Sequence, residues 1–150
     1  MHASPLTLCN NVLRRGCRDN VPISPMKLQK LMYFICRDYL QCTGEELISE
    51  NFGVWQYGPV LLTVYDEFKA CKAGPIKDYV KTAGGKAYQI DEDENPVLSG
   101  IIDSVWEKYK SLSAVELSNL THLDDSGWSM AFSRNSPKIS NEDMMDDTTG

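Results

Sequence analysis

The clearest pattern along the chain is a helical repeat of apolar positions between Ser24 and Gly44. Serine is a favoured N-cap residue, Pro25 fits the first helical position, and glycine commonly ends a helix, so the segment carries its own start and stop signals. Between them, apolar side chains recur every three or four residues: Leu28, Leu31, Met32, Ile35, Tyr39 and Cys42, widened by Phe34 and Leu40. The width of this stripe predicts a central helix that is buried on more than one side.

Weaker versions of the same periodicity predict further helices. The spacing Ser113-x-x-Glu116 matches a capping box, which opens a short helix running to about Leu120. Gly58-Pro59 is expected to break an extended stretch and to start a helix that ends near Cys71. The other predicted helical segments are Ala3 to Cys17, about Pro96 to Lys110, and a last turn capped by Asn141–Asp143.

Extended structure is predicted in only two places. Phe52 to Trp55 is short enough for a strand or an extended arm, and residues 76–90, with Gly84-Gly85, suggest a turn and a small hairpin. Ser126-Gly127-Trp128 predicts another turn, and residues 146–150 are expected to fray. The expected fold is mainly α: a single compact helical domain, residues 1–150, of about five to six helices with a small β-hairpin or short strand element. Its core is expected to span about residues 5–145.

The distribution of charge narrows the choice of partners. The net charge is −6, with a balance of +3 over residues 1–86 and −9 over residues 87–150. Nucleic acid is bound by clustered positive charge, so the acidic second half disfavours it as a partner. An acidic face suits a basic protein partner, and it suits plain solubility equally well.

The composition is that of an ordinary globular domain. The longest apolar run, Leu31 to Cys36, is far short of the roughly 20 residues that cross a bilayer. We expect no signal peptide, no membrane partner and a cytoplasmic location. The five cysteines show no C-x-x-C spacing, so they predict reduced thiols rather than a metal site or a disulfide framework.

His122 is the main candidate for catalysis, since it lies near Thr121, Asp124, Asp125 and Ser126. A histidine beside acids and hydroxyls could act as a general base. However, no second catalytic group accompanies it, so a structural role that closes the turn before Trp128 is favoured. The acidic run of residues 91–94 lacks the glycine of a calcium loop and predicts a solvated helix flank. We therefore expect neither an enzyme nor a cofactor.

Lysines and aromatic residues suggest a surface for a partner. Lys27 and Lys30 fall on or near one flank of the central helix, and Trp55, Tyr57 and Tyr65 follow it in the chain. Tyrosine and tryptophan are enriched at binding hot spots, so the five side chains could form a cationic, aromatic surface. In the alternative interpretation, Trp55 and Tyr65 pack in the core and the lysines are merely solvated.

Three motifs in order resemble one known family. They are Lys27-Leu28-Gln29-Lys30-Leu31-x-Tyr33, then Trp55-x-Tyr57-Gly58-Pro59-Val60 with Val64-Tyr65-x-x-Phe68, then Leu112-Ser113-x-x-Glu116-Leu117-Ser118-x-Leu120-Thr121-His122 with Trp128 after it. The sequence resembles the SocA-like antitoxin family, also called the Panacea domain and often described as phage-associated proteins. The resemblance spans about residues 5 to 145.

The resemblance implies a binding module rather than an enzyme. Such domains neutralise a toxin, encoded beside them in bacteria and prophages, by direct association. At least one branch delivers its toxin to an ATP-dependent protease. The contact region we expect is formed by Lys27, Lys30, Trp55, Tyr57, Pro59 and Tyr65, with Thr121, His122 and Trp128 as a structural motif. A DNA-binding regulator and a small hydrolase using His122 are the other hypotheses.

Two departures from the family pattern stand out. Members commonly have proline before the late tryptophan, whereas this chain has Gly127. Members often close with an aromatic C-terminal helix, whereas this chain ends with residues 144–150, which contain no aromatic side chain.

Overall fold

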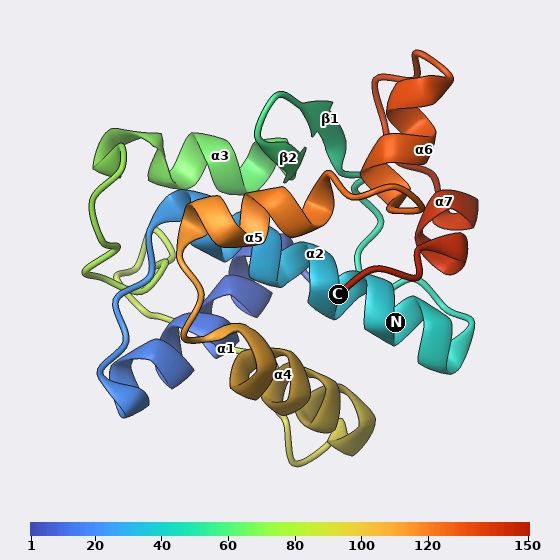
Figure 1. Ribbon diagram of the computed structural model, residues 1–150. Helices are drawn as coiled ribbons and strands as arrows, with labels where there is room; N and C mark the ends of the chain where they lie inside the picture. Colours follow the sequence, from blue (N-terminus) through green and yellow to red (C-terminus); the bar gives the residue numbers. More distant parts are fainter.

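The computed structural model describes all 150 residues and is mainly helical (Figure 1). The predicted fold class is confirmed, with seven α-helices, one short 3-10 helix (η1) and a two-stranded antiparallel sheet. The elements are α1 Pro5–Asp19, α2 Pro25–Thr43, β1 Gly53–Trp55, β2 Gly58–Val60, α3 Leu62–Phe68, η1 Lys69–Cys71, α4 Pro96–Tyr109, α5 Ala114–Thr121, α6 Gly127–Ser133 and α7 Asn141–Asp146.

Helix α2 is the centre of the molecule, as its broad apolar stripe predicts. It contacts α1, α3, α4, α5, α7 and β2. Figure 1 shows α2 between α3 and the hairpin on one side and α1 and α4 on the other. The Ser24 side chain caps its first turn, and Gly44 ends it in the left-handed conformation at φ 76°. Phe34 of α2 stacks on Tyr109 of α4 with ring centroids 4.6 Å apart.

The hairpin lies earlier in the chain than the one predicted. Val54 pairs with Pro59 and Trp55 with Gly58, so Gly58-Pro59 belongs to β2. The prediction that these two residues start a helix is wrong, since α3 begins at Leu62. Gly58 has φ 115°, a conformation that residues with a Cβ atom rarely adopt, and this favours glycine at the end of the tight turn.

Residues 76–90 form no hairpin, so that prediction is wrong. The segment has one turn, in which Thr82 N donates to Lys86 O. Ile76 N donates to Ile23 O, and side chains of α1 bind the backbone further along. Asn10 bonds Val80 N, Val80 O and Tyr88 O, and Asn11 bonds both the N–H and the C=O of Ile90. The asparagine side chains replace the ladder that a second strand would supply.

The last quarter of the chain contains a helix that the sequence did not predict. Ser126-Gly127-Trp128 is the beginning of α6 rather than a turn, because the Ser126 hydroxyl accepts a hydrogen bond from Ser129 N. The predicted last helical turn is confirmed as α7, with a capping box between Ser140 and Asp143.

The prediction that residues 146–150 fray is wrong, because the chain after α7 is bound to the rest of the domain. Asp147 is buried, and its carboxylate accepts hydrogen bonds from the Tyr33 hydroxyl at 2.6 Å, Gly127 N at 2.9 Å and Arg37 Nη1 at 3.3 Å. Thr149 N donates to the same carboxylate at 2.9 Å. The carboxylate therefore joins the C-terminal segment to α2 and to the first residue of α6.

The acidic segment of residues 91–94, predicted to be a solvated helix flank, is solvated only in part, because Glu92 is half-buried. Glu92 accepts hydrogen bonds from the buried Arg15 guanidinium at 2.6 and 2.8 Å, and from Asn11 and Ser99. Arg15 also bonds Asp103 at 2.7 Å. Partial burial disfavours the charged carboxylate, but the bonds from Arg15, Asn11 and Ser99 outweigh it and lower the pKa of Glu92 to about 2.

Replacing Glu92 by glutamine is expected to lower the free energy of unfolding by about 2 kcal/mol at pH 7. The pKa of Glu92 is depressed in the folded state, so its stabilisation is full above about pH 4.5 and is lost as the pH falls toward 2. The difference between wild type and Glu92→Gln should shrink over that interval in urea titrations. Asp93→Gln, at an exposed neighbour, serves as the control. A difference that is constant with pH would contradict the assigned ion pair.

No helix has the length and apolar character needed to span a membrane. All five cysteines are free: Cys9 and Cys36 are buried, Cys71 is half-buried, and Cys17 and Cys42 are exposed. Burial raises the pKa of the Cys9 and Cys36 thiols, which keeps them protonated.

Candidate functional site

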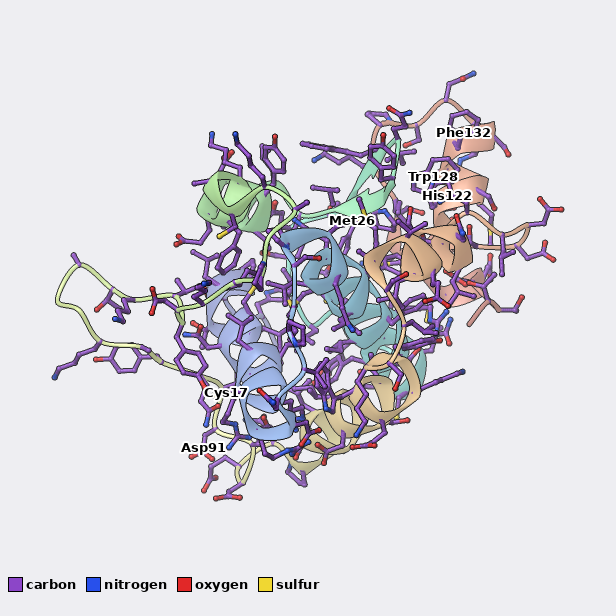
Figure 2. The ribbon with its side chains drawn as sticks, turned by 60° about the vertical axis from the view of Figure 1, so that its left-hand side comes forward. Cys17, Met26, Asp91, His122, Trp128 and Phe132 are labelled. Atoms are coloured by element: carbon purple, nitrogen blue, oxygen red, sulfur yellow. The ribbon has the colours of Figure 1, made fainter.

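The turn of the hairpin is held by side chains from two distant helices. Figure 2 shows His122, Trp128 and Phe132 together at the end of the molecule formed by α5 and α6. Side chains contact three successive carbonyl oxygens of the turn. Trp55 O accepts from Trp128 Nε1 at 2.8 Å, Tyr57 O accepts from Ser118 Oγ at 2.7 Å, and Gln56 O lies 2.8 Å from His122 Nε2. The third sequence motif (Leu112–His122 with Trp128) therefore binds the backbone of the second motif (Trp55–Val60).

Helix α2 holds the following residues of the hairpin. Lys30 Nζ donates to Pro59 O at 3.1 Å, and Gln29 bonds both Leu61 O and Leu61 N, at 3.0 and 2.9 Å. Each of the three motifs thus contributes to one structure, a hairpin whose backbone polar groups are bound from two sides. This arrangement fixes the conformation from Trp55 to Leu61.

There is no room for a side chain at Gly58. A Cβ atom there would lie 2.5 Å from Thr121 Oγ1 and 2.9 Å from Lys30 Cε. Thr121 itself is buried, and its hydroxyl donates to Ser118 O at 2.7 Å. Thr121 therefore shapes the contact between α5 and the hairpin by close approach.

The aromatic side chains of the hairpin, and Tyr65 of α3 beside them, face outward. Tyr57 is 58% exposed, Tyr65 42% and Trp55 40%, and the rings of Trp55 and Tyr65 lie 4.9 Å apart. The interpretation that Trp55 and Tyr65 pack in the core is therefore wrong. We call Trp55, Tyr57 and Tyr65 the hairpin surface. Beside it, Trp128 stacks on Phe132, which is 61% exposed, with ring centroids 5.0 Å apart.

Lys27 and Lys30 are both buried. The prediction that they form an exposed cationic surface and the alternative that they are solvated are therefore both wrong. Lys27 is buried and donates to Lys110 O, and Lys30 is only 1% exposed. Burial lowers the pKa of both amines, and that of Lys30 falls to about 7. Lysines carry long apolar stems, and each of these amines reaches a backbone carbonyl that the sequence alone could not place near it.

A groove of about 470 Å³ lies between the beginning of α2, the hairpin and α3. Its lining includes the hairpin surface and three lysines: Pro25, Met26, Gln29, Lys30, Trp55, Gln56, Tyr57, Val60, Tyr65, Lys69 and Lys72. Met26, labelled in Figure 2, marks the end of α2 that faces this groove. Of the predicted contact region, the groove thus brings together Lys30, Trp55, Tyr57 and Tyr65, whereas Lys27 and Pro59 are buried outside its lining.

His122 binds backbone rather than acids. Its Nδ1 lies 2.6 Å from Ser118 O and its Nε2 lies 2.8 Å from Gln56 O, while its ring centroid is 4.1 Å from that of Trp128. A neutral imidazole has one N–H and can donate to one of these carbonyls, whereas an imidazolium donates to both. His122 therefore has a structural role, but it contacts the turn of the hairpin rather than closing the turn before Trp128.

Sequence reasoning missed several residues of this site. Ser118 and Gln29 lie within the three motifs, and this position could have marked them as site residues. Phe132 and Lys72 lie outside the motifs, so the sequence contained no signal for them. Each of the missed hydrogen bonds joins residues more than 30 positions apart.

The sequence that forms this fold and site matches the model of a known family. The chain belongs to the family described as "Antitoxin SocA-like, Panacea domain", whose model matches residues 28–129. The matched range begins in α2 and ends in α6, and so contains the side chains that bind the turn of the hairpin, while residues 137–139, whose backbone pairs with β1, lie outside it.

One similar protein is Antitoxin SocA of Caulobacter vibrioides (strain NA1000 / CB15N), which is 36% identical over 63 residues. The aligned part covers 42% of this chain and 34% of that protein, so the chain spans about a third of the length of the curated relative. No solved structure matches the chain.

Proposed function

We propose that this protein is the antitoxin of a toxin–antitoxin pair, and that it neutralises a protein toxin by binding it through the hairpin surface. The observation that carries the proposal is a hairpin whose backbone is fixed from two sides while its aromatic rings stay exposed. The family membership and the name of the similar protein support the antitoxin role. The toxin would be the product of an adjacent gene, in a prophage-linked arrangement.

Rigidity of the hairpin favours tight association. Binding usually costs free energy because flexible loops and side chains become ordered, and a loop that is already fixed avoids much of that cost. Exposed tyrosine and tryptophan supply large contact areas with few rotatable bonds. An interface on the order of 1,600 Å² in total, centred on these rings, would cover the working surface of a small toxin.

The proposal takes the protein to act by binding rather than by catalysis. It is supported by the surroundings of His122, the main catalytic candidate, because its ring nitrogens lie 2.6 and 2.8 Å from the backbone carbonyl oxygens of Ser118 and Gln56. The partners of the His122 ring are the backbone carbonyls of Ser118 and Gln56 rather than Asp124 or Asp125, so no orienting acid accompanies it.

Replacing Tyr57 by alanine is expected to weaken toxin binding by about 30-fold, which corresponds to about 2 kcal/mol. The ring is exposed, so the folded state should keep its stability. The measurement is calorimetric titration with the product of the adjacent gene, together with growth rescue on co-expression. Tyr88→Ala is the matched control, because Tyr88 is 56% exposed and lies in the loop bound by α1.

Equal binding by wild type and Tyr57→Ala would contradict the proposed surface. A neighbouring gene product that is harmless alone, or that fails to bind, would contradict the antitoxin role itself. The same co-expression separates two routes of neutralisation. If rescue requires an intact ATP-dependent host protease and toxin levels fall, the protein delivers its toxin for degradation rather than blocking it.

A further inference from the structure

The groove beside the hairpin surface contains a buried amine with unused hydrogen-bonding capacity. An ammonium group has three donors, and Lys30 Nζ has one acceptor, Pro59 O, at 3.1 Å. The side chain is 1% exposed, yet it lines the groove, and no carboxylate compensates its charge. A buried charge without a partner is unfavourable, so an anion that reached this amine would be bound by it.

The charge of the groove has one sign. Lys30, Lys69 and Lys72 line it and no carboxylate does, in a protein whose net charge is −6. Lys69 pairs with Asp66 at 3.6 Å, an exposed contact that solvent weakens. Pro25 and Met26 place the beginning of α2 at the groove, and the N-terminal end of a helix carries partial positive charge.

The walls of the groove are aromatic and apolar. Trp55, Tyr65 and Met26 line it, and each keeps part of its surface in solvent. An apolar side chain inserted between these residues would be sheltered from water next to the Lys30 amine. The groove therefore fits a ligand that carries negative charge and an apolar group side by side.

We propose that this groove binds an acidic segment of the partner protein, with an apolar side chain of that segment against Trp55 and Tyr65 and a flanking carboxylate on Lys30 Nζ. This inference rests on the proposed function and names the chemistry of the partner. Lys69 and Lys72, at the rim, contact a second carboxylate of the same segment. Lys30 thus remains a structural residue of the hairpin until the partner supplies its counterion.

Two capped tripeptides test the inference without knowledge of the partner. They are N-acetyl-Glu-Phe-Glu-amide and its uncharged isostere N-acetyl-Gln-Phe-Gln-amide. Binding to the whole protein is followed by NMR, through the indole N–H of Trp55 and the side-chain resonances of Lys30. We expect the acidic peptide to bind at least tenfold more tightly and to shift both signals.

Lysine variants locate the anion contact. Lys30→Met should weaken binding of the acidic peptide at least tenfold and leave the neutral peptide unchanged. Lys27→Met is the matched control, since Lys27 is also buried on α2 with its amine on a carbonyl but lies outside the groove. If Lys30→Met does not fold, the exposed pair Lys69→Gln and Lys72→Gln decides, with a loss of at least threefold expected.

Equal affinity for the two peptides, no binding of either, or acidic-peptide binding that survives the lysine changes would overturn the inference. These outcomes are distinct from a failure of the proposed function. If Tyr57→Ala abolishes rescue while the peptides are not distinguished, only the acidic partner chemistry is wrong. If the peptides are distinguished but no adjacent gene product is neutralised, the antitoxin role is wrong and the groove still binds acidic segments.

Discussion

Replacing Asp147 by asparagine is expected to lower the free energy of unfolding by about 3 kcal/mol, a large part of the stability of a domain of this size. The carboxylate is buried and accepts hydrogen bonds from Tyr33, Arg37, Gly127 N and Thr149. An amide of the same shape loses the charge and turns one acceptor into a donor. Whichever way it is oriented, an N–H group then faces other donors.

The effect should extend to the hairpin. Gly127 N is held by the Asp147 carboxylate, and the next residue, Trp128, donates to Trp55 O. Loosening the first turn of α6 therefore frees the turn of the hairpin. Urea unfolding measures the loss of stability, and hydrogen exchange of the Trp128 indole N–H measures the loosening.

Asp146→Asn is the matched control, because Asp146 carries the same charge one residue earlier and is exposed. It should change the free energy of unfolding by less than about 0.5 kcal/mol. If Asp147→Asn were as mild as the control, the C-terminal segment would be peripheral to the fold. Unchanged exchange of the Trp128 indole in a destabilised Asp147→Asn would separate the two effects and contradict the coupling.

The elements that the sequence predicted well are those whose signals are local. The boundaries of α2 follow from Ser24, Pro25 and Gly44, and α5 follows from its capping box, because each signal acts within one helical turn. The start of α6 was missed although Ser126 is also a cap. The Ser-Gly-Trp sequence at this point is also typical of a turn, and α6 has only seven residues, too few for a clear helical repeat of apolar positions.

The extended segments were predicted less well, because a strand depends on a partner that the sequence does not name. Residues 76–90 have the glycines and the alternation of a hairpin, but Asn10 and Asn11 of α1 bind their backbone instead. Conversely, Gly58-Pro59 looked like a helix start and is a strand. A two-stranded hairpin alone is marginally stable, so its position here depends on the side chains that bind its turn and on the backbone of residues 137–139, which pairs with β1.

The candidate site shows the same division between local and distant information. The aromatic residues were identified correctly, and their exposure was one of two open alternatives. Lysine is rarely fully buried, so Lys27 and Lys30 were both expected in solvent. Their burial depends on carbonyl groups of Lys110 and Pro59, which lie 83 and 29 residues away in sequence.

Replacing Lys30 by methionine is expected to change how stability depends on pH. The pKa of Lys30 is about 7 in the folded protein, below its usual value of 10.5, because burial disfavours the charged amine. Between these values the unfolded chain binds one more proton, so the free energy of unfolding of the wild type rises with pH. The slope attributable to Lys30 approaches about 1.4 kcal/mol per pH unit, and methionine removes it.

From pH 6.5 to pH 9, the wild type should therefore gain about 2–3 kcal/mol relative to Lys30→Met, measured by urea unfolding at each pH. The Cys9 and Cys36 thiols are present in both proteins, so their contribution cancels in the difference. Lys30→Gln separates charge from hydrogen bonding, since its amide can still donate to Pro59 O. It should lack the pH dependence as Lys30→Met does, while losing less stability at pH 9. If the curves of wild type and both variants ran parallel, Lys30 would keep its proton through this range, and the amine would have a counterion or solvent contact that the structure does not show.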